Sequence, residues 1–138
     1  GADGAIVEEV RHSVESAGGS VKIVAPRIGG VTLANGALLP ADGQLAGSPS
    51  VLFDAVALIV SESGCADLVK DSAAVDFVQD AFVHLKAIGH VAAAAALLDK
   101  AGVAADELIL DVTKSGKDFA TAAATRQWDR EPRVRSLA

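Results

Sequence analysis

The sequence predicts an α/β domain with a mainly parallel sheet that is covered by helices on both faces. Apolar runs of strand length alternate along the chain with segments of helical spacing. One of these runs, AVALIVS at 55–61, is continuously apolar and too short for a globular helix, which is typical of a strand buried on both faces. The alternation favours parallel pairing, because parallel strands need a crossover connection between them.

The first half of the chain predicts a helix, a strand and a hairpin. After the loop GADG, helical spacing places four apolar residues on one face: Ile6, Val7, Val10 and Val14. The run VKIVA at 21–25 predicts a strand that ends at Pro26. Asn35 and Gly36 between two apolar arms predict a hairpin whose two turn residues both take positive φ. The stretch ADGQLAGSPS at 41–50 is predicted to be a loop.

The second half predicts three helices and two further strands. The first helix has Ser72 as its expected N-cap and an apolar face formed by four residues: Val75, Val78, Phe82 and Leu85. Strands are predicted at 86–91 and 107–112, and Gly102 is placed to end the helix between them. Ser115, with an acid three residues later, predicts the start of the last helix.

We expect one domain over residues 1–138, with an irregular tail at 130–138. The alternation of elements begins with a helix, and GADG resembles the loop that follows a first strand. In a doubly wound sheet of the flavodoxin type that first strand is central. We therefore predict that the chain is a fragment of a longer protein, and that residues outside it or another chain cover the strand edges left unpaired.

Composition argues against several classes of function. The net charge of -6 and the lack of a long basic stripe argue against a nucleic acid partner. With one cysteine, Cys65, the chain cannot form an intramolecular disulfide. No apolar run has the length of a transmembrane helix, and nothing at the start resembles a signal peptide. The expected location is therefore the cytoplasm.

The stretch AIGHVAAAAALL at 87–98 has the form of a strand, a turn and a helix, as in a nucleophile elbow. An elbow needs Ser or Cys at the turn, whereas Gly89 suits a strained turn but has no side chain. His90 would be a general base only with a nucleophile to activate. Three candidates follow another strand: Ser61, Ser63 and Cys65. The alternative, which the residues favour, is a His90 that caps or fills the turn.

Cys65 has two interpretations. It lies at or near a predicted helix start, where the helix dipole favours a thiolate and hence a redox role. A lone cysteine is more often a small buried apolar residue. His12 and His84 lie in predicted helices without metal-ligand spacing, so no metal site is expected. No glycine-rich phosphate-binding pattern follows a strand.

Three stretches carry a resemblance to a known family. The first, VKIVAPRIGGVTLANGALLPADGQLAGSPSVLFDAVALIV at 21–60, has a strand, APR-G, a hairpin and AG-PS--FDAV in that order. DFVQDAFVHLKAIG at 76–89 and RQWDREPRV at 126–134 belong to the same pattern. Together they resemble the C-terminal domain of large-subunit haem catalases, over nearly the whole chain. The resemblance implies a flavodoxin-like three-layer fold, similar to the class I glutamine-amidotransferase and intracellular-protease superfamily.

The resemblance also implies what the chain lacks. Active members of the superfamily carry a Cys at the elbow and usually an acid after the first strand. Here the Cys position falls on Gly89 and the acidic position falls near Ile6. The parent enzyme is implied to be a homotetrameric catalase that converts hydrogen peroxide to water and oxygen. Its haem is implied to lie in an upstream domain on a Tyr ligand, and this chain has no Tyr, so we expect no cofactor in it.

Three hypotheses of function follow. The first is a non-catalytic accessory domain that packs on the upstream haem domain, shapes access to the haem and stabilises the tetramer. The second is a holdase for unfolded proteins, which needs an exposed apolar patch. The third is a stand-alone hydrolase or deglycase that uses Cys65, and it ranks last because the elbow position is empty.

Overall fold

The computed structural model describes eight stretches of the chain: residues 3–16, 24–25, 31–33, 35–39, 43–44, 55–106, 108–113 and 116–122. The helices are α1 (Gly4–Ser16), α2 (Glu62–Leu68), α3 (Ser72–Val83), α4 (Ala95–Lys100) and α5 (Gly116–Ala122), with a 3-10 turn, η3 (Ala92–Ala94), directly before α4. The strands are β1 (Val24–Ala25), β2 (Val31–Thr32), β3 (Leu38–Leu39), β4 (Gly43–Gln44), β5 (Ala55–Leu58), β6 (Ala87–His90) and β7 (Ile109–Asp111). Our predictions at Pro26, Ser115 and 130–138 lie outside these stretches.

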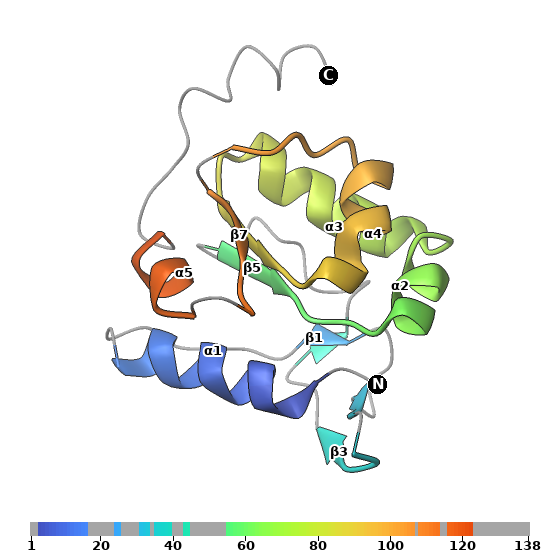
Figure 1. The fold of residues 1–138 in the computed structure, drawn as a ribbon. Helices are drawn as coiled ribbons and strands as arrows, with labels where there is room; N and C mark the ends of the chain where they lie inside the picture. The colour runs from blue at the N-terminus through green and yellow to red at the C-terminus, as the bar shows by residue number, and fades with distance from the viewer. Residues whose placement is uncertain are drawn as a thin grey trace.

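The three-layer α/β class predicted from the sequence is confirmed. β5, β6 and β7 form a parallel sheet in that order. α1 and α5 pack together on one face of this sheet, and α3 and α4 cover the other face with α2 beside them (Figure 1). The apolar face of α1 is confirmed as well, because Val7 and Val10 are buried while Ile6 and Val14 pack against the core.

Several strands are shorter than predicted. The run at 55–61 stays in the sheet only as far as Leu58, because the chain then turns to place Ser61 at the start of α2.

The prediction of loop over 41–50 is wrong at β4, which pairs in parallel with β1. Each of these strands has only two residues, which is too short for an alternation of apolar and polar side chains to appear in the sequence.

Within the described residues β1 and β4 form a sheet separate from β5, β6 and β7. Our expectation that residues outside this sequence, or another chain, cover unpaired strand edges stays a prediction.

The N-cap of α3 is Asp71, and our assignment of Ser72 is wrong by one residue. The carboxylate Oδ1 of Asp71 accepts a hydrogen bond from the backbone N–H of Ala73 at 2.9 Å, on an extended backbone. Ser72 is the first residue of the helix and is exposed. Both residue types favour N-caps, so composition alone could not decide between two neighbours.

Two helices end in the same motif, one on glycine and one on leucine. At the end of α4, Gly102 has φ of 75°, and the N–H of Val103 donates to the carbonyl of Leu98. This is the Schellman motif that Gly102 predicted. Leu85 takes the same place after α3 with φ of 65°, so our assignment of Leu85 to the helical face is wrong. Leu85 is nevertheless buried, and that burial offsets the strain of its left-handed backbone.

Replacing Gly102 with alanine should destabilise the domain by about 1 kcal/mol, because a Cβ is strained at this φ. Gly102→Asn is the matched control and should cost less, since asparagine tolerates the left-handed region. Urea denaturation of both variants measures the difference. An alanine variant as stable as the parent chain would contradict the assignment.

The hairpin predicted at Asn35 and Gly36 is confirmed, but its turn differs from the one expected. Gly36 has φ of 87°, whereas Asn35 is not in the left-handed region. The N–H of Leu33 donates to the carbonyl of Ala37 at 2.8 Å, and the N–H of Gly36 donates to the carbonyl of Leu33 at 2.9 Å. The loop therefore closes between Leu33 and Ala37, and a hairpin loop of this length needs only one left-handed residue.

Candidate functional site

The carboxyl ends of β5, β6 and β7 form the candidate site, because open parallel sheets bind ligands at this edge. Leu58 pairs with His90 across β5 and β6, and His90 pairs with Asp111 across β6 and β7. Ser61 follows β5 at the same edge. The fold thus brings Ser61, which follows β5, near the end of β6, the strand that carries Gly89 and His90.

Gly89 lies within β6, and the backbone does not bend there. Its φ is not in the left-handed region, and the chain leaves the strand only at Val91, the residue before η3. A Cβ built on Gly89 would lie 2.6 Å from Cγ1 of Val112 and 2.8 Å from Cδ1 of Phe119. Our expectation that Gly89 occupies a strained turn is therefore wrong. Its lack of a side chain lets α5 pack closely on β6.

His90 is half-buried, and its ring bonds to its own turn. Nδ1 lies 3.4 Å from the carbonyl oxygen of Val91. In the part of the chain that the structure describes, no hydrogen bond joins this ring to Ser61, Ser63 or Cys65. This contact supports the interpretation in which His90 fills the turn, because a general base needs its nucleophile within hydrogen-bond reach.

The hydroxyl of Ser61 is the N-cap of α2. Its Oγ accepts a hydrogen bond from the backbone N–H of Gly64 at 3.0 Å and lies 3.2 Å from Oγ of Ser63. An N-cap of this kind satisfies a helix N–H that would otherwise lack a partner. The geometry gives Ser61 a structural task that the sequence did not predict.

Cys65 lies in the first turn of α2, as expected from the sequence, and points into the core. Its exposed fraction is 2%, and it packs in the cluster that includes Val56, Phe82 and Leu97. Reactive cysteines sit in partly exposed, electropositive surroundings. The burial supports the interpretation of Cys65 as a small apolar core residue.

The thiol of Cys65 should therefore be strongly protected. Because a reagent must wait for the core to open, we expect alkylation of the native chain to be slower by about a hundredfold or more than alkylation in urea, as set by an opening free energy of about 3 kcal/mol. Labelling with a thiol reagent, quantified by intact mass, measures both rates. Similar rates in the two conditions would instead support a reactive, redox-sensitive cysteine.

The position near Ile6, where the superfamily usually has an acid, carries no carboxylate that faces the core. Ile6 is half-buried on α1 and packs against the core. The nearby Glu8 and Glu9 are exposed. Oε1 of Glu8 lies 3.8 Å from Nη1 of Arg11 in a surface ion pair. Such exposed pairs contribute little to stability.

Sequence reasoning missed two titratable residues beside β6. Asp111 ends β7 next to His90, and its Oδ1 accepts a hydrogen bond from the N–H of Thr113 at 2.9 Å. The sequence carried a signal for Asp111, because this acid interrupts the apolar run ELILDV near its carboxyl end. Lys86, directly before β6, has an exposed fraction of only 4%. A lysine is rarely buried without a partner, and no sequence pattern marks this one.

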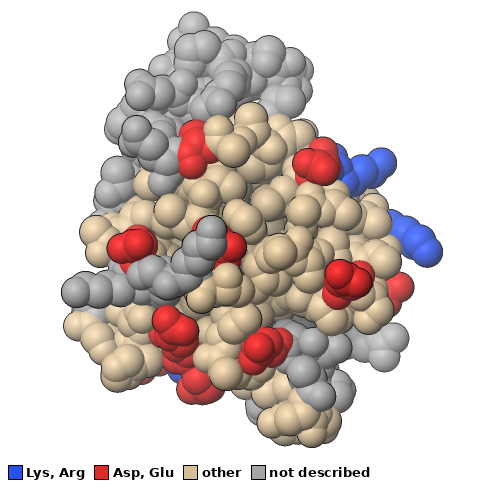
Figure 2. Space-filling model, viewed as in Figure 1, with Lys and Arg blue, Asp and Glu red and all other residues tan. Residues whose placement is uncertain are grey.

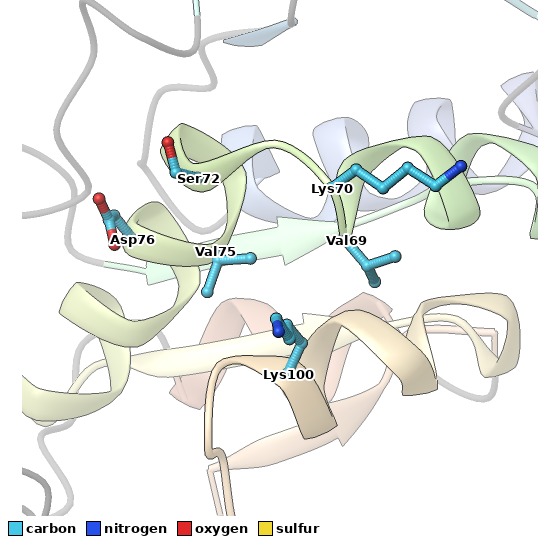
Figure 3. Close-up of a pocket in the computed structure, with 6 residues that line it drawn as sticks. All are labelled: Val69, Lys70, Ser72, Val75, Asp76 and Lys100. Carbon is cyan, nitrogen blue, oxygen red and sulfur yellow. The ribbon is translucent and has the colours of Figure 1, made fainter.

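An open pocket of about 480 Å³ has α4 on one side and, on the other, the turn between α2 and α3 (Figure 3). Its lining combines apolar, basic and acidic residues: Val69, Lys70, Ser72, Val75, Asp76 and Lys100. Lys70 points along α2, away from Ser72 and Asp76 at the start of α3 (Figure 3). The charges do not converge on one point, and the pocket does not include the residues at the carboxyl edge of the sheet.

Comparison with known families identifies the domain. The family described as the C-terminal domain found in long catalases matches residues 1–130. The chain belongs to this family. The match confirms the resemblance carried by the sequence stretches, including the specific one at 21–60.

Relatives of this catalase C-terminal domain are much longer proteins. The chain is 42% identical to Catalase C of Rhizobium meliloti over 98% of its own length, but it spans only 20% of that relative. It is 40% identical to Catalase HPII of Mycobacterium avium over 65% of the chain and 13% of the relative. The chain therefore corresponds to a minor part of the curated catalases that it matches.

Solved structures with the same fold belong to the DJ-1 group. A DJ-1 superfamily protein of Salmonella typhimurium matches with a TM-score of 0.73 at 21% identity, over 100% of this chain and 91% of that one. DJ-1beta of Drosophila melanogaster matches with a TM-score of 0.74 at 17% identity, over 99% and 91%. At these identities the likeness shows the fold alone.

The catalase C-terminal domain has no counterpart of the haem ligand that the resemblance implies, because the whole chain lacks Tyr. His12 is exposed on α1. His84 caps the end of α3, and its Nδ1 lies 2.6 Å from the carbonyl oxygen of Asp80. Over the described stretches no three His, Cys, Asp or Glu residues gather as metal ligands would.

Acidic side chains are scattered across the described part of the face in Figure 2, while the basic ones lie mainly at one side. The described residues of this face therefore form no basic patch of the kind that binds nucleic acid. Among the described helices, none combines the length and the apolar character that crossing a membrane requires.

Proposed function

We propose that this chain is a non-catalytic accessory domain of a large-subunit catalase. The family match over residues 1–130 carries the proposal. In this proposal the intact protein decomposes hydrogen peroxide to water and oxygen, and the haem that performs the reaction lies in a domain upstream of this one. The share of 20% that the chain takes of Catalase C leaves room for such a domain.

The lack of catalysis in the domain itself is supported by observations at three positions: Gly89, His90 and Cys65. The space beside Gly89 is filled by Val112 and Phe119, so a nucleophile has no room there. The His90 ring bonds to its own turn, and Cys65 is buried in the core. The proposed contribution of the domain is stability of a homotetrameric, cytoplasmic enzyme and control of access to its haem.

Two alternatives receive less support. A holdase needs a broad apolar surface, whereas the described residues expose one large hydrophobic side chain, Leu38. A hydrolase that uses Cys65 would need that thiol to reach solvent. Suppression of the thermal aggregation of a test protein at equimolar amounts would revive the first alternative, and loss of a detected activity on alkylation of Cys65 would revive the second.

Haem titration and peroxide turnover test the proposal together. The purified intact protein should show a Soret band and release oxygen from peroxide. The chain 1–138, incubated with haemin, should neither shift the Soret band of free haemin nor release oxygen faster than haemin alone. A Soret shift or turnover from the chain alone would overturn the non-catalytic assignment. An intact protein without peroxide turnover would overturn the catalase assignment.

A further inference from the structure

The β2–β3 hairpin, residues 31–39, stands apart from the sheets and helices of the fold (Figure 1). Each of its strands has two residues, and over the described residues the two strands pair only with each other. A hairpin of this size is at best marginally stable in water, and it needs a further strand or a packing surface. The hairpin therefore needs a packing surface, and among the described residues the contact at its base with α1 is the one that the structure gives.

The exposed strand of the hairpin carries Leu38, whose exposed fraction is 64%. A single exposed leucine is ordinary on a protein surface and carries no inference by itself. Here it lies on β3, opposite Thr32, in a hairpin whose strands pair only with each other over the described residues. A leucine in this place supplies the apolar contact that the hairpin needs, provided that another surface covers it.

The base of the hairpin touches the beginning of α1. A Cβ built on Gly4, the first residue of α1, would lie 3.1 Å from Cδ1 of Leu33. In the family, this domain is the C-terminal one of long catalases, so the rest of the enzyme precedes α1 along the chain. The body of the enzyme is thus joined to the domain on the side where the hairpin stands.

We propose that the hairpin docks on the catalase body of the intact protein and that Leu38 inserts into an apolar surface there. This proposal rests on the proposed function, because the occupant is the upstream part of the same enzyme. Burial of one leucine side chain is worth about tenfold or more in the docking equilibrium. The polar tip at Asn35 stays at the edge of the contact.

Photo-cross-linking in the intact protein tests the contact. A benzophenone amino acid replaces Leu38 in one variant and Ala104, an exposed residue in the loop after α4, in the control. We expect cross-links from position 38 to peptides that precede this domain, and none from position 104. Cross-links from position 38 only to the domain of a second copy, or no cross-link at all, would overturn the docking proposal.

Leu38→Asp in the intact protein gives a second readout. Limited proteolysis should release the domain about tenfold faster in this variant, because a carboxylate resists burial in an apolar surface. Ala104→Asp should release it at the parent rate, and an unchanged rate in Leu38→Asp would overturn the proposal. Peroxide turnover of the same samples distinguishes failure of the docking proposal from failure of the proposed function. Only an absence of turnover in the protein without substitutions would count against the proposed function.

Discussion

Replacing Gly89 with cysteine should destabilise the domain by about 3 kcal/mol and create no new activity. A Cβ at this position would lie 2.6 Å from Cγ1 of Val112 and 2.8 Å from the ring of Phe119. Both neighbours are buried, with exposed fractions of 0% and 4%. The added atoms would therefore push on Val112 after β7 and on Phe119 of α5, and relieving the clash would disturb the packing of α5 on the sheet. Urea denaturation measures the loss of stability.

A double-mutant cycle makes this prediction specific to the contact. Gly89→Ala should be destabilising alone, and adding Val112→Ala should cost less than the sum of the two single changes, because the smaller residue relieves the clash. Gly64→Ala is the matched control, since its Cβ would meet only the hydroxyl of Ser61 at 3.1 Å, and it should change stability by less than about 1 kcal/mol. A stable, thiol-reactive Gly89→Cys variant would contradict the closed site.

Truncating Phe82 to alanine should cost about 4 kcal/mol, the largest loss that we expect for a single substitution. Phe82 lies on α3 with an exposed fraction of 1%, in the cluster that also holds Ile88 of β6 and Leu97 of α4. Phe82 therefore belongs to the core that packs α3 and α4 against the central strand. Removing it leaves a cavity that the tightly packed neighbours fill only in part.

Phe77 on the same helix is the matched control for Phe82. It is half-buried and packs at the margin of the same cluster, so Phe77→Ala should cost less than half as much. Thermal and urea denaturation of both variants compare the two losses. Equal losses would show that the core is not centred where the structure places it.

The elements with strong periodicity could be predicted from the sequence. The face of α1 follows from Val7 and Val10, and β6 follows from a short apolar run before an alanine-rich helix. β4 could not be predicted, because a strand of two residues is too short to show a periodic pattern. Leu85 could not be predicted either, because it holds a left-handed position where glycine is the usual residue.

The candidate site was predictable in part. The sequence shows that Gly89 has no side chain, but it cannot show that Val112 and Phe119 fill the space beside it. That contact joins residues far apart in the chain, and only the approach of α5 to β6 creates it. The burial of Cys65 was one of two interpretations left open, and the packing of α2 against the core favours it.

Peroxide turnover per haem, in the intact protein with Cys65 and His90 both replaced by alanine, tests the central claim most directly. These two residues are the thiol and the imidazole that a catalytic role for this domain would require. We expect turnover within about twofold of the unsubstituted enzyme, because a change below about 0.4 kcal/mol in the barrier is all that an indirect effect should produce. A loss of tenfold or more in a protein that keeps its haem and its tetramer would contradict the account.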